Sequence, residues 1–147
     1  MQNYKMSQTN VIAYCLFGVS ISLLIVGLVS GTFAHHIIQI IPMLIVAVTM
    51  RRTNDYGLAL GLSLLVFWLF IMIFIWMFLL GIARIVTGHY SLAEIILTII
   101  MALISSFGII KILRSNFRAN RFLLLIIFIA GLVIQYGFVI LSYRLPL

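Results

Sequence analysis

Seven polar or ionisable side chains stand out because they lie within or beside long apolar stretches of this chain. They are His35, His36, Gln39, Arg84, His89, Glu94 and Gln135. Ionisable groups are costly at membrane depth and are functional candidates where they occur there. If the apolar stretches are membrane helices, all seven lie toward one side of the membrane. A compact bundle could bring them into one outer vestibule, so we treat them as candidate ligand-binding residues.

A metal site is one chemistry that this set could support. His35 or His36, together with His89 and Glu94, would supply nitrogen and oxygen ligands suited to zinc or copper. Adjacent histidines on a helix point about 100° apart, so one ion would take only one of His35 and His36. The sequence contains neither an HxH nor an HxxxH spacing. The pattern therefore does not favour a metal site.

Transport and anion binding are two further chemistries. Glu94 could serve transport or a proton relay, while Arg84 and the histidines could receive a carboxylate, a phosphate or a lipid headgroup. Each residue also has a simpler structural interpretation. Ser91-x-x-Glu94 matches a capping box at a helix start. Arg84 suits an interfacial anchor, and Gln135 could bridge two helices by a hydrogen bond.

Enzyme activity is not predicted by any motif in the sequence. A glycine-rich phosphate loop, a pair of carboxylates and an HExxH motif are all absent. Serines of the apolar stretches, such as Ser20 and Ser22, are expected to bond to their own helix or a neighbouring one. Cys15 is the single cysteine, which excludes an internal disulfide and a multi-thiolate metal site in this sequence. We expect neither an enzyme nor a bound cofactor.

The composition indicates that lipid is the solvent for most of the chain. Hydrophobic residues make up 65% of the 147 residues and charged residues 7%, whereas a soluble domain carries about 25% charged residues. The net charge of +7 does not indicate nucleic-acid binding, because the basic residues lie in short connections between apolar stretches. There they set topology and contact anionic lipid. The expected partners are the lipid bilayer and other membrane subunits or a second copy, with no nucleic acid.

Five apolar stretches are long enough to cross a bilayer core, which needs about 17–25 helical residues. They cover residues 11–30, 34–50, 57–81, 91–110 and 122–143. We therefore predict an all-α integral membrane protein, a five-transmembrane-helix bundle in which residues 1–147 form a single membrane domain. Pro42 predicts a kink in the second span, and Gly88 predicts the end of the third. Asn54 or Asp55 would cap the start of the third span.

Glycine spacing predicts close helix contacts. Gly27 lies within the first span and Gly31 follows it directly, four residues later. Gly57 and Gly61 lie four residues apart in the third span. Such GxxxG spacings let two helix backbones approach closely. The two pairs lie toward opposite ends of the membrane, so we expect them to mediate different contacts.

Charge asymmetry sets the expected orientation. With five spans, seven basic residues fall on one side, namely Lys5, Arg51, Arg52, Lys111, Arg114, Arg118 and Arg121. Arg84 and Arg144 fall on the other side. Basic residues accumulate on the cytoplasmic side, so the amino terminus is expected in the cytoplasm and the carboxyl terminus outside. The chain's size and basic loops favour a multi-pass protein of a bacterial inner membrane.

Three function classes remain open on sequence alone. The first is a non-catalytic accessory protein or subunit of a larger membrane complex, which would explain the close-packing glycines and the lack of a catalytic set. The second is a small carrier or binding protein for a small or lipidic ligand that uses the outer polar residues. The third is a metal or redox protein that uses the histidines.

Overall fold

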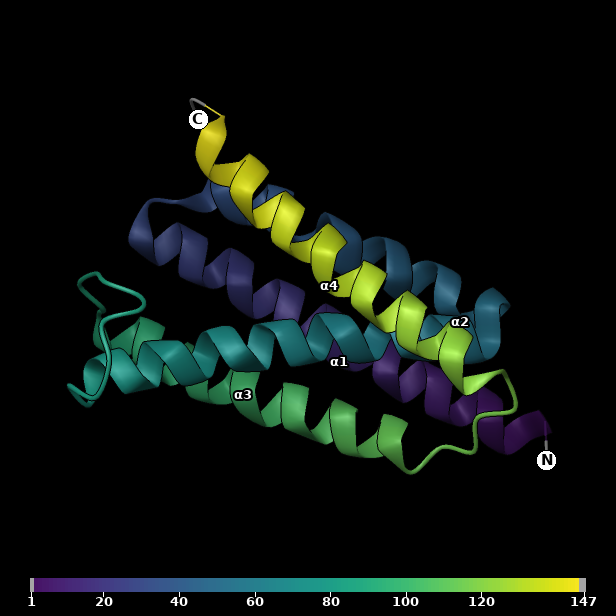
Figure 1. Ribbon diagram of the computed structural model, residues 1–147. Coiled ribbons are helices and arrows are strands. Elements are labelled where there is room, and N and C mark those ends of the chain that lie inside the picture. Colours follow the sequence, from purple (N-terminus) through teal and green to yellow (C-terminus); the bar gives the residue numbers. More distant parts are fainter. Residues whose placement is uncertain (1, 146–147) are drawn as a thin grey trace.

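A computed structural model describes the backbone of residues 2–145 and the side chains of residues 8–50 and 55–145. Within that range the chain forms helices α1 over Gln2–Ser30, α2 over Phe33–Leu79, α3 over Leu92–Leu113 and α4 over Arg121–Arg144 (Figure 1). The side chains of Lys5, Arg51, Arg52 and Asn54 lie outside the described residues.

Helix α2 is folded back on itself. Met50 Cε lies 3.3 Å from the position that a Cβ atom on Gly61 would occupy. In a straight helix, at 1.5 Å per residue, these two residues would lie about 16 Å apart along the axis. In Figure 1 the blue and teal parts of α2 accordingly run in opposite directions. We call Phe33–Met50 the first arm and Asp55–Leu79 the second arm.

Five helical segments of the described chain are therefore long and apolar enough to cross a membrane. They are Gln8–Ser30, the two arms of α2, Leu92–Leu113 and Arg121–Arg144. Their bounds agree with the predicted spans to within three residues at each end. The prediction of an all-helical chain with five such helices is confirmed.

Two residues predicted to mark helix ends, Gly88 and Asp55, do not do so. The second arm ends at Leu79, well before Gly88, and Gly81 with φ +72° turns the chain away from it. Glycine adopts this left-handed conformation without the steric cost that a side chain would add. Asp55 caps no separate helix, because α2 continues through it. Its Oδ2 instead accepts hydrogen bonds from the backbone N–H groups of Arg118 at 2.7 Å and Ala119 at 3.0 Å.

Pro42 is the residue at which a kink was predicted. It lies inside the first arm, and the helix continues on both sides of it. The chain reverses only after Met50, so the proline does not produce the fold-back of α2. Asp55 lies just beyond the reversal and fastens it to the connection between α3 and α4 through its two backbone hydrogen bonds.

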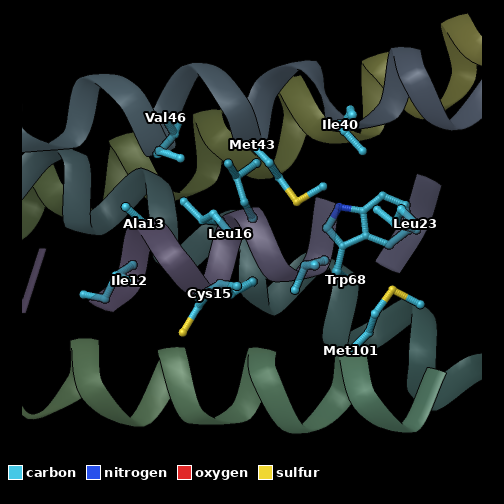
Figure 2. Packing of buried hydrophobic residues seen from close by; sticks show 14 of the residues in the cluster. Ile12, Ala13, Cys15, Leu16, Leu23, Ile40, Met43, Val46, Trp68 and Met101 are labelled. Carbon is cyan, nitrogen blue, oxygen red and sulfur yellow. The ribbon is translucent and has the colours of Figure 1, made fainter. Parts of the chain in front are cut away.

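The apolar core lies between α1, both arms of α2 and α3. Leu16 and Leu23 enter it from α1, Met43 from the first arm, Trp68 from the second arm and Met101 from α3 (Figure 2). Helix α4 lies outside this core, because among the described helices it contacts only α2. The fold is thus a group of four packed segments with α4 added on one side.

The faces by which α3 and α4 pack are unusually polar. The buried residues of α3 follow a spacing of alternating four and three residues: Glu94, Thr98, Met101, Ser105, Gly108 and Ile112. Those of α4 are Gly131, Gln135 and Ser142. Large apolar side chains of α4, such as Ile129 and Val133, are exposed instead. Such an arrangement suits helices in lipid, where small and polar residues hold helices together.

Glycines mark the closest helix contacts, but not always the predicted ones. A Cβ atom on Gly27 would lie 2.9 Å from Phe33 Cα, and one on Gly108 would lie 2.6 Å from Leu65 Cδ1. A Cβ atom on Gly131 would overlap the side chain of Ser63. Gly31 has open space around it and φ +72°, so it forms the turn between α1 and α2 rather than a helix contact.

Gly131 and Gly137 provide a matched pair of substitutions on α4. We expect Gly131→Ala to lower the free energy of unfolding by about 1–3 kcal/mol, because its methyl group would displace Ser63. Gly137→Ala should cause no loss, since nothing lies within 4 Å of the added atom. Thermal unfolding of the purified variants in detergent would compare them. Equal stability of the two variants would contradict the close packing of α4 on the second arm.

Candidate functional site

The buried polar residues of α4 meet the start of α2 at one end of the molecule. We call His35, Gln39, Gln135 and Ser142 the polar junction. His35 and Gln39 lie in the first two turns of the first arm, and Gln135 and Ser142 lie on one face of α4. The sequence predicted three of these four residues as site candidates and placed them at the same side of the membrane.

Hydrogen bonds join the two helices directly at the polar junction. Gln39 Nε2 donates to Ser142 Oγ at 2.9 Å, and Gln135 Nε2 donates to the backbone oxygen of Gln39 at 2.9 Å. Both glutamines are buried, with exposed fractions of 2% and 0%. A buried amide without a partner would be costly, so these bonds make the pairing of α4 with the first arm specific.

His35 completes the junction near the end of α4. Its Nδ1 lies 2.6 Å from the backbone oxygen of Ser142. A carbonyl oxygen can only accept, so Nδ1 carries the proton and donates. The His35 ring also lies 5.6 Å, centroid to centroid, from the ring of Tyr143. His35 is thus engaged in holding the last turn of α4 against the first arm.

Ser142 was not among the residues that the sequence pointed to. Its Oγ accepts from Gln39 and donates to the backbone oxygen of Val139 at 2.7 Å. The signal that could have found it is its spacing from Gly131 and Gln135, which places all three on one face of a helix. Small and polar residues repeated at helical spacing in an apolar segment indicate a buried face.

Glu94 forms the predicted capping box at the start of α3. Its Oε2 accepts from the backbone N–H and the hydroxyl of Ser91, both at 2.7 Å, and its own N–H donates to Ser91 Oγ at 3.3 Å. The capping box is therefore confirmed. Its carboxylate also lies close enough to His36 and Tyr90 to interact with them electrostatically.

Tyr90 lies in the connection before α3. Its ring lies 6.1 Å from that of Phe78. Partial burial, followed by the nearby Tyr143 and Glu94, raises the pKa of the Tyr90 hydroxyl. The hydroxyl therefore stays protonated at neutral pH and can act as a hydrogen-bond donor.

The structure brings together most of the predicted candidates but not all of them. His36 packs against Gly27 of α1, next to the polar junction. Arg84 and His89 are exposed in the connection between α2 and α3, and neither belongs to the junction. Among the described residues no three His, Cys, Asp or Glu side chains lie close enough to hold a metal ion. The set His35, His36, His89 and Glu94 is therefore not assembled into a metal centre.

Two polar atoms of this region are buried without a hydrogen-bond partner among the described residues. They are Oε1 of Gln135 and Nδ1 of His36. An amide oxygen at this depth could accept a hydrogen bond from water or from a ligand. In contrast, the hydroxyls of Ser20 and Ser22 donate to the backbone oxygens of Leu16 and Gly18, as expected for serines that bond to their own helix.

Comparison with known proteins identifies no relative. No protein-family model, no curated protein and no solved structure matches this chain.

The hydrogen bond between Gln39 and Ser142 can be tested by a double-mutant cycle. We expect Ser142→Ala to lower the free energy of unfolding by about 1 kcal/mol, because Gln39 Nε2 would be left buried without an acceptor. Adding Gln39→Leu should recover part of this loss, since the unpaired donor is then removed. Ser22→Ala is the control, because its hydroxyl bonds only within α1. Equal losses in Ser142→Ala and Ser22→Ala would contradict an interhelical role.

Proposed function

We propose that this protein is a small, non-catalytic membrane subunit or accessory protein that acts through helix contacts with a larger membrane complex. The observation that carries the proposal is the use of its polar side chains. Gln39, Gln135 and His35 bond to the neighbouring helix, and Glu94 caps α3. These residues support the packing of the chain itself, which leaves few groups for chemistry on a substrate.

The outward face of α4 is the surface best suited to a partner. Helix α4 contacts only α2 among the described helices, and only three of its residues are buried. Its exposed side includes a stripe at helical spacing: Leu125, Ile129, Val133, Tyr136 and Ile140. Residues at such spacing form one continuous face that a second membrane helix could cover.

Partner capture from native membranes in mild detergent would test the proposal. We expect a stoichiometric membrane partner, identified by mass spectrometry, and efficient cross-linking to it from a photoreactive residue in place of Val133. The same residue in place of Leu28 of α1 is the control, because Leu28 and Val133 are both 64% exposed. A chain recovered alone, or equal cross-linking from both positions, would count against a partner on α4.

A small carrier or binding protein is the second candidate. The unpartnered Oε1 of Gln135 and Nδ1 of His36 favour it, because a ligand with hydrogen-bond donors could satisfy the amide oxygen. Recovery of the chain without a partner would shift support to this function and make Gln135 the first residue to substitute.

We further propose that the chain spans the inner membrane of a bacterium with its amino terminus in the cytoplasm. Lys111, Arg114, Arg118 and Arg121 lie where α3 ends and α4 begins, which we call the basic end. Asp55 joins this region to the reversal of α2. Arg84 follows the end of α2 and Arg144 is the last residue of α4, both at the opposite end of the bundle, so the charge difference supports a cytoplasmic basic end.

Cysteine labelling in intact cells would test this orientation. In a chain carrying Cys15→Ala, we expect a membrane-impermeant thiol reagent to label Leu145→Cys from outside. It should label Asn116→Cys, at the basic end, only after the membrane is opened. Labelling of position 116 in intact cells would reverse the proposed orientation, while protection of both positions would contradict a membrane crossing by α4.

A further inference from the structure

An apolar groove runs along the outside of the bundle between α1 and α3. Its volume is about 420 Å³, within the range of about 300–1,000 Å³ typical of small-ligand sites. The lining comes from three residues of each helix: Val11, Tyr14 and Cys15 of α1, and Leu103, Ile104 and Phe107 of α3. Apart from the Tyr14 hydroxyl and the Cys15 thiol, these side chains offer hydrocarbon to an occupant.

The close contact of the two helices forms the floor of this groove. A Cβ atom on Gly108 would lie 3.3 Å from Cys15 Cβ, and one on Gly18 would lie 3.2 Å from Ile104 Cδ1. The residue numbers of the contacts rise along α1 as they fall along α3, so the two helices run antiparallel, with little space between them. Tyr14 and Leu103 are both well exposed and line the groove, Tyr14 from α1 and Leu103 from α3. The groove is therefore a fixed feature of the helix packing.

A positive charge lies at the mouth of the groove. Lys111 Nζ lies 5.5 Å from the centroid of the Phe107 ring, and Phe107 lines the groove. Arg114 follows within one turn at the end of α3 and is exposed. A lysine stem can lie along apolar surface while its ammonium group stays at the membrane interface. The groove is thus apolar along its length and has a positive charge at one end.

The acidic residues of the chain offset only part of the positive charge at this end. The sequence has two, Asp55 and Glu94. Glu94 lies in the first turn of α3, at the opposite end of that helix from Lys111. Asp55 lies at the basic end, where it accepts two backbone hydrogen bonds from the connection between α3 and α4. Its single negative charge is outnumbered there by the four positive charges of Lys111, Arg114, Arg118 and Arg121. The mouth of the groove therefore favours an anion.

We propose that this groove binds one anionic phospholipid of the leaflet at the basic end, with an acyl chain along the groove and the phosphate against Lys111. The acyl chain would contact the apolar side chains that line the groove, and the negative phosphate would be attracted by the positive charge of Lys111. An uncharged lipid would use only the first of these features. The proposal rests on the membrane location proposed above, and it does not require that a protein partner exists.

Photo-cross-linking in vesicles would test this site. The full chain would be reconstituted in phosphatidylcholine with a trace of phosphatidylglycerol that carries a photoreactive acyl chain. We expect cross-links to concentrate on the groove residues of α1 and α3 rather than on Leu125 and Ile129 of α4. Lys111→Gln should lower the groove yield by about fivefold, the contribution of one basic residue near an anionic lipid surface.

Matched variants distinguish a specific lipid site at the groove from a general electrostatic attraction of anionic lipid to the basic end. Arg121→Gln removes one charge at the same end but on α4, so the groove yield should not change. Lys111→Arg keeps the charge and should retain the yield. The proposal is overturned if the Lys111 and Arg121 variants behave alike, if cross-links spread evenly over lipid-facing helices, or if a photoreactive phosphatidylcholine labels the groove equally well.

Insertion is measured first, as resistance of the reconstituted chain to carbonate extraction. A chain that does not insert would overturn the membrane location and the lipid site together. An inserted chain without selective groove labelling would overturn the lipid site alone. Thermal unfolding of each variant distinguishes a lost lipid contact from a misfolded protein, because Lys111→Arg and Arg121→Gln should both unfold like the parent chain.

Discussion

The rest of this structure depends on one constraint. Its apolar helices gain little free energy from burying more hydrocarbon, so they must approach one another closely to stay together. In lipid the apolar side chains of α3 and α4 are equally well solvated inside or outside the bundle, so contact must come from close packing and hydrogen bonds. The buried face of α4 accordingly consists of Gly131, Gln135 and Ser142. A helix of a soluble protein would bury the opposite face, the one that carries Ile129 and Val133.

The sequence was sufficient to predict the features that depend on length and local chemistry. Five spans follow from apolar length alone, and their bounds agree with the structure to within three residues. The capping box at Ser91 and Glu94 was also predictable, because all its hydrogen bonds join residues three positions apart. The placement of His35, Gln39 and Gln135 at one end followed from counting spans, since antiparallel neighbours bring those segments to the same side.

The features that depend on pairing between distant residues were not predictable in the same way. Nothing local shows that the Gln39 side chain bonds to Ser142 while its backbone oxygen accepts from Gln135, because both bonds depend on the rotation of α4 about its axis. The wrong glycine was predicted to terminate the second arm, because Gly81 and Gly88 are both plausible terminators by type. The role of Asp55 was misread for a related reason: its hydrogen-bond donors lie at Arg118 and Ala119, far away in sequence.

The polar groups at the two ends of the bundle have different roles. At the polar end, side-chain amides and a histidine bond to the neighbouring helix, so their polarity is used to fix α4 on the first arm. At the basic end, Asp55 accepts hydrogen bonds from backbone N–H groups of the α3–α4 connection, Lys111 Nζ lies over the Phe107 ring and Arg114 is exposed. Polarity at one end is therefore used within the fold, whereas much of the charge at the other end lies at the surface of the bundle.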